Sequence, residues 1–269
     1  MRTLAPRALL LLDIDGVIRD VSDSYRQAIR LTFYHFSGKA LMPGAIDRLK
    51  LEGCWNNDWD ATIELLRRMD RRYPLENGVP DRATVVKFFS DAYFGGDSEG
   101  DPDSWKGLIR HESLLVSPKL FDELNQHGIA WGFVSGAEPA SARFLLEHRL
   151  GLQRPALIAM GDAPEKPDPT GLLTLARRLA KQPLGIGSPP LAYLGDTVAD
   201  VETLQRARQQ CPGQLVLSMA VAPPHLHRPG REEERYQYEE CLRNAGADII
   251  LMETKCALRV LLDWISDQV

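Results

Sequence analysis

The sequence predicts an α/β fold in which a Rossmann-like parallel sheet forms the core and an all-helical cap domain is inserted after the first strand. The run Ala8–Leu12 is apolar throughout and stops at Asp13, as expected of a short strand buried on both faces. From about residue 113, short apolar runs alternate with helical segments, which is typical of βαβ units. Residues 21–112 instead show helical periodicity and no convincing strand.

The predicted elements of the core alternate regularly along the chain. In order they are a helix at Pro118–His127, a strand at Ile129–Val134, a helix at Pro139–His148, a strand at Ala156–Met160, a helix at Pro169–Ala180, a strand at Leu191–Leu194, a helix at Val198–Arg208, a strand at Leu215–Val221, a helix at Glu232–Asn244, a strand at Asp248–Leu251 and a helix from Lys255. Strands separated by helices of this length form a parallel sheet, so their carboxyl ends meet at one edge.

The cap domain is predicted to contain three main helices. Ser22 is a plausible N-cap of the first helix, Asn57 or Asp58 opens the second, and Asp81 opens the third. The expected domains are therefore residues 1–20 with 113–269 for the core and residues 21–112 for the cap.

Composition limits the class of protein. Apolar residues make up 44% and charged residues 26% of the 269 positions, as in an ordinary globular protein. The net charge of −5 does not indicate a nucleic-acid partner, and no apolar run approaches the ~18 residues of a membrane span. The four cysteines form no CxxC pair, and the apolar run before Asp13 is shorter than the ~7 residues of a signal-peptide core. We expect a cytoplasmic monomer or homodimer.

Polar side chains follow four of the predicted strands. They are Asp13 and Asp15 with Gly16, then Ser135 with Gly136, then Lys166, and finally Asp196 with Asp200. Taken singly, each has a structural explanation as a helix cap, a turn residue or a solvated lysine. Because the carboxyl ends of parallel strands meet, we expect these side chains to converge. Clustered carboxylates repel one another, so a divalent cation, a bound phosphate or both would be needed beside them.

At these four points the sequence resembles the haloacid dehalogenase-like hydrolase superfamily, in the subfamily IA type with a helical C1 cap. The resemblance covers residues 8–210. It implies that Asp13 is a nucleophile that forms an aspartyl-phosphate and that Asp15 is the general acid and base. It also implies that Ser135, Gly136 and Lys166 bind phosphate oxygens.

The resemblance further implies a Mg²⁺ site. The Asp13 carboxylate, the Asp15 backbone carbonyl and Asp196 would bind the ion, and Asp200 would do so either directly or through water. The expected partner is a small phosphorylated metabolite.

The reaction implied is hydrolysis of a phosphomonoester. A dehalogenase is disfavoured because Asp15 is present, and a dinucleotide-binding oxidoreductase because no GxGxxG follows the first strand. A phosphonate hydrolase, for which Lys39 or Lys50 could form a Schiff base, remains an alternative. A phosphosugar mutase and a non-catalytic binding protein of the same fold remain alternatives as well.

Candidate specificity residues are Arg19, Trp55, Asn56 and Asn57. Arg19 could bind a second anionic group of the substrate or form a salt bridge at the hinge. Trp55, Asn56 and Asn57 could recognise a small hydroxylated group. Equally, they could form a helix–helix turn in which the tryptophan packs and Asn57 caps a helix.

Overall fold

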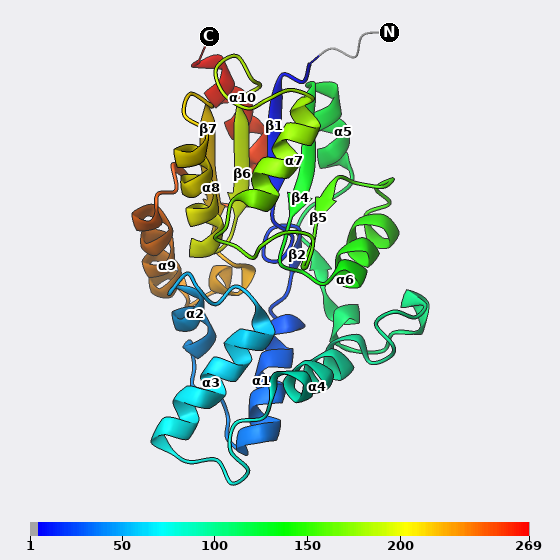
Figure 1. Cartoon of the computed structure of the whole chain (residues 1–269), viewed down its shortest axis with the longest axis vertical. Coiled ribbons are helices and arrows are strands. Elements are labelled where there is room, and N and C mark those ends of the chain that lie inside the picture. Colours follow the sequence, from blue (N-terminus) through cyan, green and yellow to red (C-terminus); the bar gives the residue numbers. More distant parts are fainter. Residues whose placement is uncertain (1–4, 269) are drawn as a thin grey trace. The chain divides into compact units, whose positions relative to one another are not determined.

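The computed structural model describes residues 5–268, and it divides the chain into two compact units (Figure 1). The core unit contains the chain up to Asp20 and from Leu114 onward, and the inserted unit is Val21–Ser113. Residues 1–4 of the predicted core, which precede the first apolar run, and residue 269 lie outside the described part of the chain.

The core unit is built on a parallel sheet of six strands, which confirms the predicted fold class. The strand order is β5-β4-β1-β6-β7-β8, and every neighbouring pair is parallel. The strands are β1 (Ala8–Leu12), β4 (Ile129–Val134), β5 (Leu157–Ile158), β6 (Leu191–Gly195), β7 (Val216–Val221) and β8 (Ile249–Leu251).

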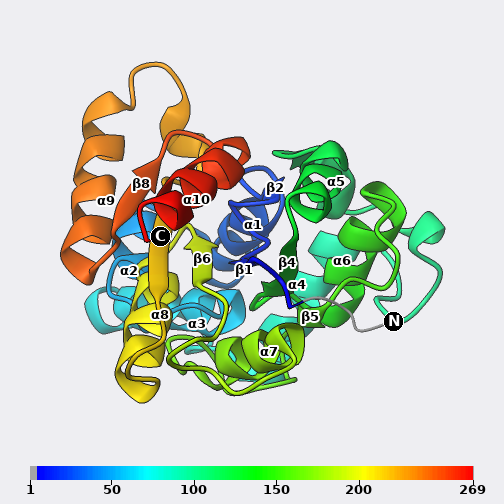
Figure 2. The ribbon, with the colours of Figure 1, turned by 90° about the horizontal axis from the view of Figure 1, so that it is seen from above.

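Helices cover both faces of this sheet. They are α5 (Lys119–Gln126), α6 (Pro139–Arg143) with the π-helix η3 (Phe144–Arg149), α7 (Thr170–Ala180), α8 (Val198–Gln210), α9 (Glu232–Ala245) and α10 (Ala257–Ser266), together with the 3₁₀ turns η4 (Pro224–His227) and η5 (Thr254–Cys256). Figure 2 shows α5 and α10 on one side of the sheet and α7 and α8 on the other.

Strand β1 lies at the centre of the sheet, between β4 and β6. Leu10 and Leu12 pack into the core on the side of α5 and α10, whereas Leu9 and Leu11 pack into the core on the side of α7 and α8. All five residues of β1 are fully buried. This two-sided burial explains why the strand is uniformly apolar rather than alternating.

The inserted unit is helical, as predicted, but its first helix begins later than expected. It contains α1 (Tyr25–Ser37), α2 (Ala45–Lys50), α3 (Asp58–Arg72) and α4 (Arg82–Phe94), followed by the 3₁₀ turns η1 (Pro102–Ser104) and η2 (Leu108–His111). The N-cap position of α1 is Ser24 rather than Ser22, and the Ser24 hydroxyl donates to buried Glu112 at 2.8 Å instead of capping the helix. The short helix α2 has no counterpart in the sequence-based prediction.

Asn57 and Asp81 do cap the two helices that they were predicted to open. The Asn57 side chain accepts from the backbone N–H of Trp59 and Asp60, and Asp81 accepts from that of Thr84. Two short strands, β2 (Arg19–Asp20) and β3 (Ser113–Leu114), form a separate two-stranded sheet at the ends of the insertion.

Two core elements differ from the prediction near the edge of the sheet. Only Leu157 and Ile158 of the expected strand Ala156–Met160 pair with β4, because Met160 turns away and donates its N–H to the Ala137 carbonyl. The predicted helix Pro139–His148 is regular only to Arg143 and continues as the π-helix η3. None of the helices within residues 5–268 has the length and apolar character that a membrane span requires.

The two-sided burial of β1 predicts the cost of shortening one of its side chains. Leu11→Ala removes a fully buried side chain, so we expect the free energy of unfolding to fall by about 2–5 kcal/mol. Leu215→Ala is the matched control because Leu215 is 46% exposed, and its cost should stay below about 0.5 kcal/mol. Urea unfolding followed by circular dichroism measures both values, and equal costs would contradict the placement of β1.

Candidate active site

The register of the sheet brings the polar residues after three strands to one edge. Leu12 of β1 lies opposite Phe133 in β4 and Leu194 in β6. Asp13 therefore follows β1 at the level where β4 and β6 also end, and its N–H still donates to the Leu194 carbonyl at 2.9 Å. Ser135 directly follows β4 and Asp196 directly follows β6. The expected convergence at the carboxyl edge is present.

Lys166 lies between two carboxylates at this edge, those of Asp13 and Asp200. Its Nζ is 2.6 Å from Asp13 Oδ1 and 2.6 Å from Asp200 Oδ1. The side chains of Lys166, Asp13 and Asp200 are 6%, 8% and 2% exposed, so water screens these ion pairs weakly. Burial alone would lower the pKa of Lys166, but the two carboxylates hold it well above its usual value.

A third carboxylate, Asp196, belongs to the same buried cluster. Asp13, Asp196 and Asp200 each offer a ligand oxygen, and these atoms lie within 4.8 Å of one another. Within residues 5–268 no basic side chain lies within ion-pair distance of Asp196, and its residue is 8% exposed. Burial, followed by repulsion from Asp200 and Asp13, raises the pKa of Asp196 well above its usual value.

The same forces act on Asp13. Burial raises its pKa to about 7, the Lys166 ammonium opposes this rise, and Asp200 and Asp15 add to it. Without a cation, the Asp13 carboxyl is therefore only partly ionised at neutral pH. A further positive charge beside Asp13 would lower this pKa and favour the ionised carboxylate.

These residues fit a divalent cation. When all three ionise, the buried carboxylates carry more negative charge than the single ammonium group offsets, in a site from which water is largely excluded. Carboxylate oxygens are the ligands that Mg²⁺ and Ca²⁺ prefer. The cluster is thus consistent with a metal site.

Asp200 differs from the other two carboxylates because protein donors already occupy both of its oxygens. Oδ1 accepts from Lys166 Nζ at 2.6 Å and from the Tyr193 hydroxyl at 2.8 Å. Oδ2 accepts from the Thr197 N–H at 3.0 Å and the Thr197 hydroxyl at 2.6 Å. A carboxylate has about four acceptor positions, and here all four are used. Although burial opposes ionisation, Lys166 and these donors hold the pKa of Asp200 below its usual value.

Tyr193 and Thr197 were missed by the sequence-based analysis. Tyr193 lies within β6, is 1% exposed, and its hydroxyl is also 3.2 Å from the Val134 carbonyl. Thr197 is the N-cap of α8 and forms a capping box with Asp200. The spacing Thr-x-x-Asp and a tyrosine inside an otherwise apolar strand were the signals available in the sequence.

Two glycines allow the acidic residues to approach this closely. A Cβ on Gly16, whose φ is +76°, would lie 2.0 Å from Asp196 Oδ2. A Cβ on Gly195 would lie 2.2 Å from the Asp200 Cβ. Any side chain at either position would displace a carboxylate of the cluster.

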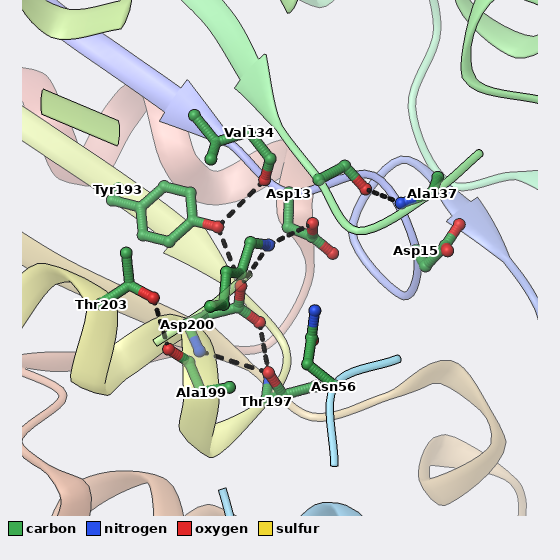
Figure 3. A network of polar contacts seen from close by, with 12 residues as sticks. Asp13, Asp15, Asn56, Val134, Ala137, Tyr193, Thr197, Ala199, Asp200 and Thr203 are labelled. Atoms are coloured by element: carbon green, nitrogen blue, oxygen red, sulfur yellow. Dashed lines mark hydrogen bonds and ion pairs between the residues drawn. The ribbon is translucent and has the colours of Figure 1, made fainter. Parts of the chain in front are cut away.

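Asp15 lies outside the ion-pair network and is paired with Arg19. Arg19 Nε is 2.6 Å from Asp15 Oδ1, and Arg19 Nη1 donates to the Ser141 hydroxyl at 2.7 Å. In Figure 3 the Asp15 carboxylate points away from Asp13. The Arg19 side chain is fully buried whereas that of Asp15 is 26% exposed. Of the two interpretations of Arg19, the structure shows the salt bridge.

The expected phosphate-binding loop follows β4. The buried Ser135 hydroxyl accepts from the Ala137 N–H at 3.2 Å, and α6 begins only at Pro139, so Ser135 is not a helix N-cap. Gly136 is partly buried beside it.

The predicted specificity segment of the inserted unit forms the start of a helix. Asn57 caps α3, the Trp55 indole N–H donates to Glu52 at 2.9 Å, and Lys50 donates to the Asn56 carbonyl at 2.8 Å. For Asn57 the structure shows the helix-capping interpretation. The Asn56 side-chain amide has no hydrogen-bond partner within residues 5–268.

Comparison with known proteins identifies the family. The profile of the haloacid dehalogenase-like hydrolases matches residues 8–208. The chain therefore belongs to this family, and the helical insertion between β1 and β4 fits the C1 cap type. The chain is also 31% identical over 249 residues to an imidazoleglycerol-phosphate dehydratase of Phytophthora nicotianae. That match covers 92% of this chain but only half of the relative's length.

Solved structures share the fold. A phosphonoacetaldehyde hydrolase-like protein from Oleispira antarctica superposes with a TM-score of 0.69 at 15% identity, covering 99% of this chain and 96% of that protein. A phosphatase from Thermococcus thioreducens superposes with a TM-score of 0.58 at 21% identity, covering 87% of this chain and 99% of that protein.

The raised pKa of Asp13 predicts a pH dependence of stability. Because its pKa is about 7 in the folded protein and 3.8 in the unfolded chain, protonation of Asp13 stabilises the fold. This stabilisation is complete below pH 3.8 and is lost as the pH rises through 7. We expect metal-free wild-type protein to lose stability across this window more steeply than Asp13→Asn, as measured by urea unfolding at each pH.

A saturating divalent cation should reduce that difference, since it stabilises the ionised carboxylates. Identical pH profiles for wild-type and Asp13→Asn protein, with and without the cation, would contradict this account of the cluster.

Proposed function

We propose that the protein is a Mg²⁺-dependent phosphatase that hydrolyses a phosphomonoester of a small metabolite. One observation supports this most strongly: a buried carboxylate, Asp13, lies against the Lys166 ammonium and within a cluster of acidic metal-ligand candidates. Phosphoryl transfer to a carboxylate requires an anionic nucleophile, a cation and phosphate-binding groups close together.

In the first step an Asp13 oxygen attacks phosphorus, and the bond between phosphorus and the ester oxygen breaks. Asp15 gives its proton to the departing alcohol. In the second step Asp15 takes a proton from water, the oxygen of that water attacks phosphorus, and Asp13 is released as a carboxylate. Asp15 must leave the Arg19 salt bridge to do this, which its partial exposure permits.

The remaining residues bind and orient. Mg²⁺ held by Asp13, the Asp15 carbonyl and Asp196 would neutralise the charge between nucleophile and phosphate. Lys166, Ser135 and the Gly136 N–H would bind the non-bridging oxygens. Asp200 would act by fixing Lys166, or on the metal through water, because its acceptor positions are filled. In the inserted unit, the Asn56 side-chain amide is the candidate for substrate recognition, because no hydrogen bond engages it within residues 5–268.

The Phytophthora relative suggests one substrate to test. Its name denotes an enzyme that acts on imidazoleglycerol phosphate, and the matching half of that protein resembles this chain. The dehydratase activity does not transfer, because this chain spans only half of the relative. The name does place an imidazole-bearing phosphomonoester among the first compounds to test.

The phosphonate hydrolase alternative receives less support. It requires a free lysine amine, but Lys50 Nζ is paired with Asp58 at 2.6 Å and donates to the Asn56 carbonyl at 2.8 Å. Lys39 Nζ lies over the Tyr73 ring, 4.3 Å from its centroid. A mutase would share the first step, and it is separated from a phosphatase by whether inorganic phosphate is released.

Phosphate release from an aryl phosphate tests the proposal. With Mg²⁺ we expect turnover by the wild-type protein and a loss of at least about 10³-fold in Asp13→Asn, because the nucleophile is removed. In Asp15→Asn, the aryl leaving group needs no proton, so a burst of phenol equal to the enzyme concentration should precede slow hydrolysis. Asp122→Asn, at an exposed position of α5, should retain turnover within about twofold.

Undiminished phosphate release by Asp13→Asn would rule the mechanism out. Metal-dependent binding of phosphometabolites by wild-type protein, without any turnover, would support a non-catalytic binding protein instead.

A further inference from the structure

A polar pocket lies at the β5 edge of the core sheet. Its volume is about 470 Å³, and all its lining residues lie between positions 143 and 178 of the core unit. Figures 1 and 2 show β5 at this edge with α6 and α7 on either side of it. A volume of this size is within the range of small-molecule sites. None of the lining residues belongs to the acidic cluster or to its ion-pair network.

Three arginines line this pocket: Arg143, Arg154 and Arg178. In the part of the chain that the structure describes, none of the three forms an ion pair or a side-chain hydrogen bond. Other arginines of the chain do so, as when Arg68 pairs with Glu52 at 2.6 Å. All three are exposed, so water screens their mutual repulsion, and their N–H donors remain available to an anion.

The two acidic lining residues do not cancel this charge. Asp162 Oδ2 accepts from the Ala159 N–H at 2.9 Å, and Asp162 pairs with none of the three arginines. Glu147 is exposed and pairs with none of the three arginines. Three arginines against two carboxylates leave the lining with a formal net charge of +1.

The backbone around the pocket is irregular on two sides. One wall comes from the π-helix η3 (Phe144–Arg149), a conformation that is rare and frequently found at functional sites. On another wall, Arg154 has a φ of +47°, in the left-handed region that most side chains avoid. A regular helix and an extended residue would present these side chains differently.

We propose that this pocket binds a small polyanion, an organic phosphate or a polycarboxylate with at least two negative charges. Guanidinium groups recognise phosphate and carboxylate alike through paired N–H donors, so the shared chemistry is a compact, multiply charged anion. Three arginines of a net positive pocket match a ligand of two or more charges better than a single carboxylate. The pocket is distinct from the site that holds Lys166, although the loop of Ala159 and Asp162 continues to that residue.

Calorimetric titration with pyrophosphate and, separately, with citrate tests the proposal. The buffer contains salt at roughly 150 mM, near the physiological ionic strength, to suppress weak surface binding. It contains no divalent cation. We expect one equivalent of at least one anion to bind to the wild-type chain. The double variant Arg154→Gln/Arg178→Gln should bind it at least about tenfold more weakly, because two charge-assisted contacts are lost.

Arg177→Gln is the matched control, since Arg177 is an exposed arginine of α7 outside the pocket. The affinity of this variant for the anion should stay within about twofold of the wild-type value. Arg143→Gln provides an independent variant at the end of α6, and it should also weaken binding. Preference for pyrophosphate indicates a phosphate ligand, and preference for citrate a carboxylate.

Lys166→Met separates this site from the candidate active site. It should bind the anion as the wild-type chain does, whether or not the protein proves to be a phosphatase, because the titration requires no turnover. Loss of binding in Lys166→Met, equal binding by the double variant, or no binding of either anion would overturn the proposal.

Discussion

The contact on which the site depends is that of one buried ammonium, Lys166, with two buried carboxylates, Asp13 and Asp200. Removing these groups from water costs free energy, and their mutual attraction offsets part of that cost only while the geometry is kept. Asp196 adds a third carboxylate without a basic side chain of its own in the described chain. When ionised, the cluster is thus short of positive charge, and this shortage is consistent with a cation site.

The fold supplies the precision that such a cluster needs. Strand β1 is held between β4 and β6 and is buried on both faces, so the position of Asp13 is set by the sheet rather than by a loop. Gly16 and Gly195 leave the space into which Asp196 and Asp200 fit. Tyr193 and Thr197 then fix the Asp200 carboxylate from two further directions. Side chains held by rigid elements and by their own hydrogen bonds lose little free energy to reorganisation when substrate binds.

Much of this arrangement follows from sequence periodicity. A uniformly apolar run that ends in Asp13, followed by alternating helices and strands, is enough to place the ends of several strands at one edge, and the family resemblance agrees with that topology. What periodicity does not carry is the electrostatic environment. The pKa of Asp13 depends on burial and on the charges of Lys166 and Asp200, which lie more than a hundred positions away in sequence.

Local competition between hydrogen bonds explains the other differences. The Ser24 hydroxyl contacts Glu112 rather than the end of α1, and Met160 bonds to Ala137 rather than extending β5. Such choices depend on partners distant in sequence, which single-sequence patterns do not reveal. Asn57, by contrast, caps α3 by accepting from the N–H groups of the residues two and three positions further on. The sequence alone indicated that local interaction.

Calorimetric titration of Mg²⁺ into the wild-type protein and into Asp196→Asn tests the central claim most directly. An excess of buried negative charge predicts one Mg²⁺ site in the wild-type protein and its loss, or a weakening of at least about tenfold, in Asp196→Asn, where one charged ligand becomes neutral. Equal affinity in the two proteins, or no binding to the wild-type protein, would contradict it.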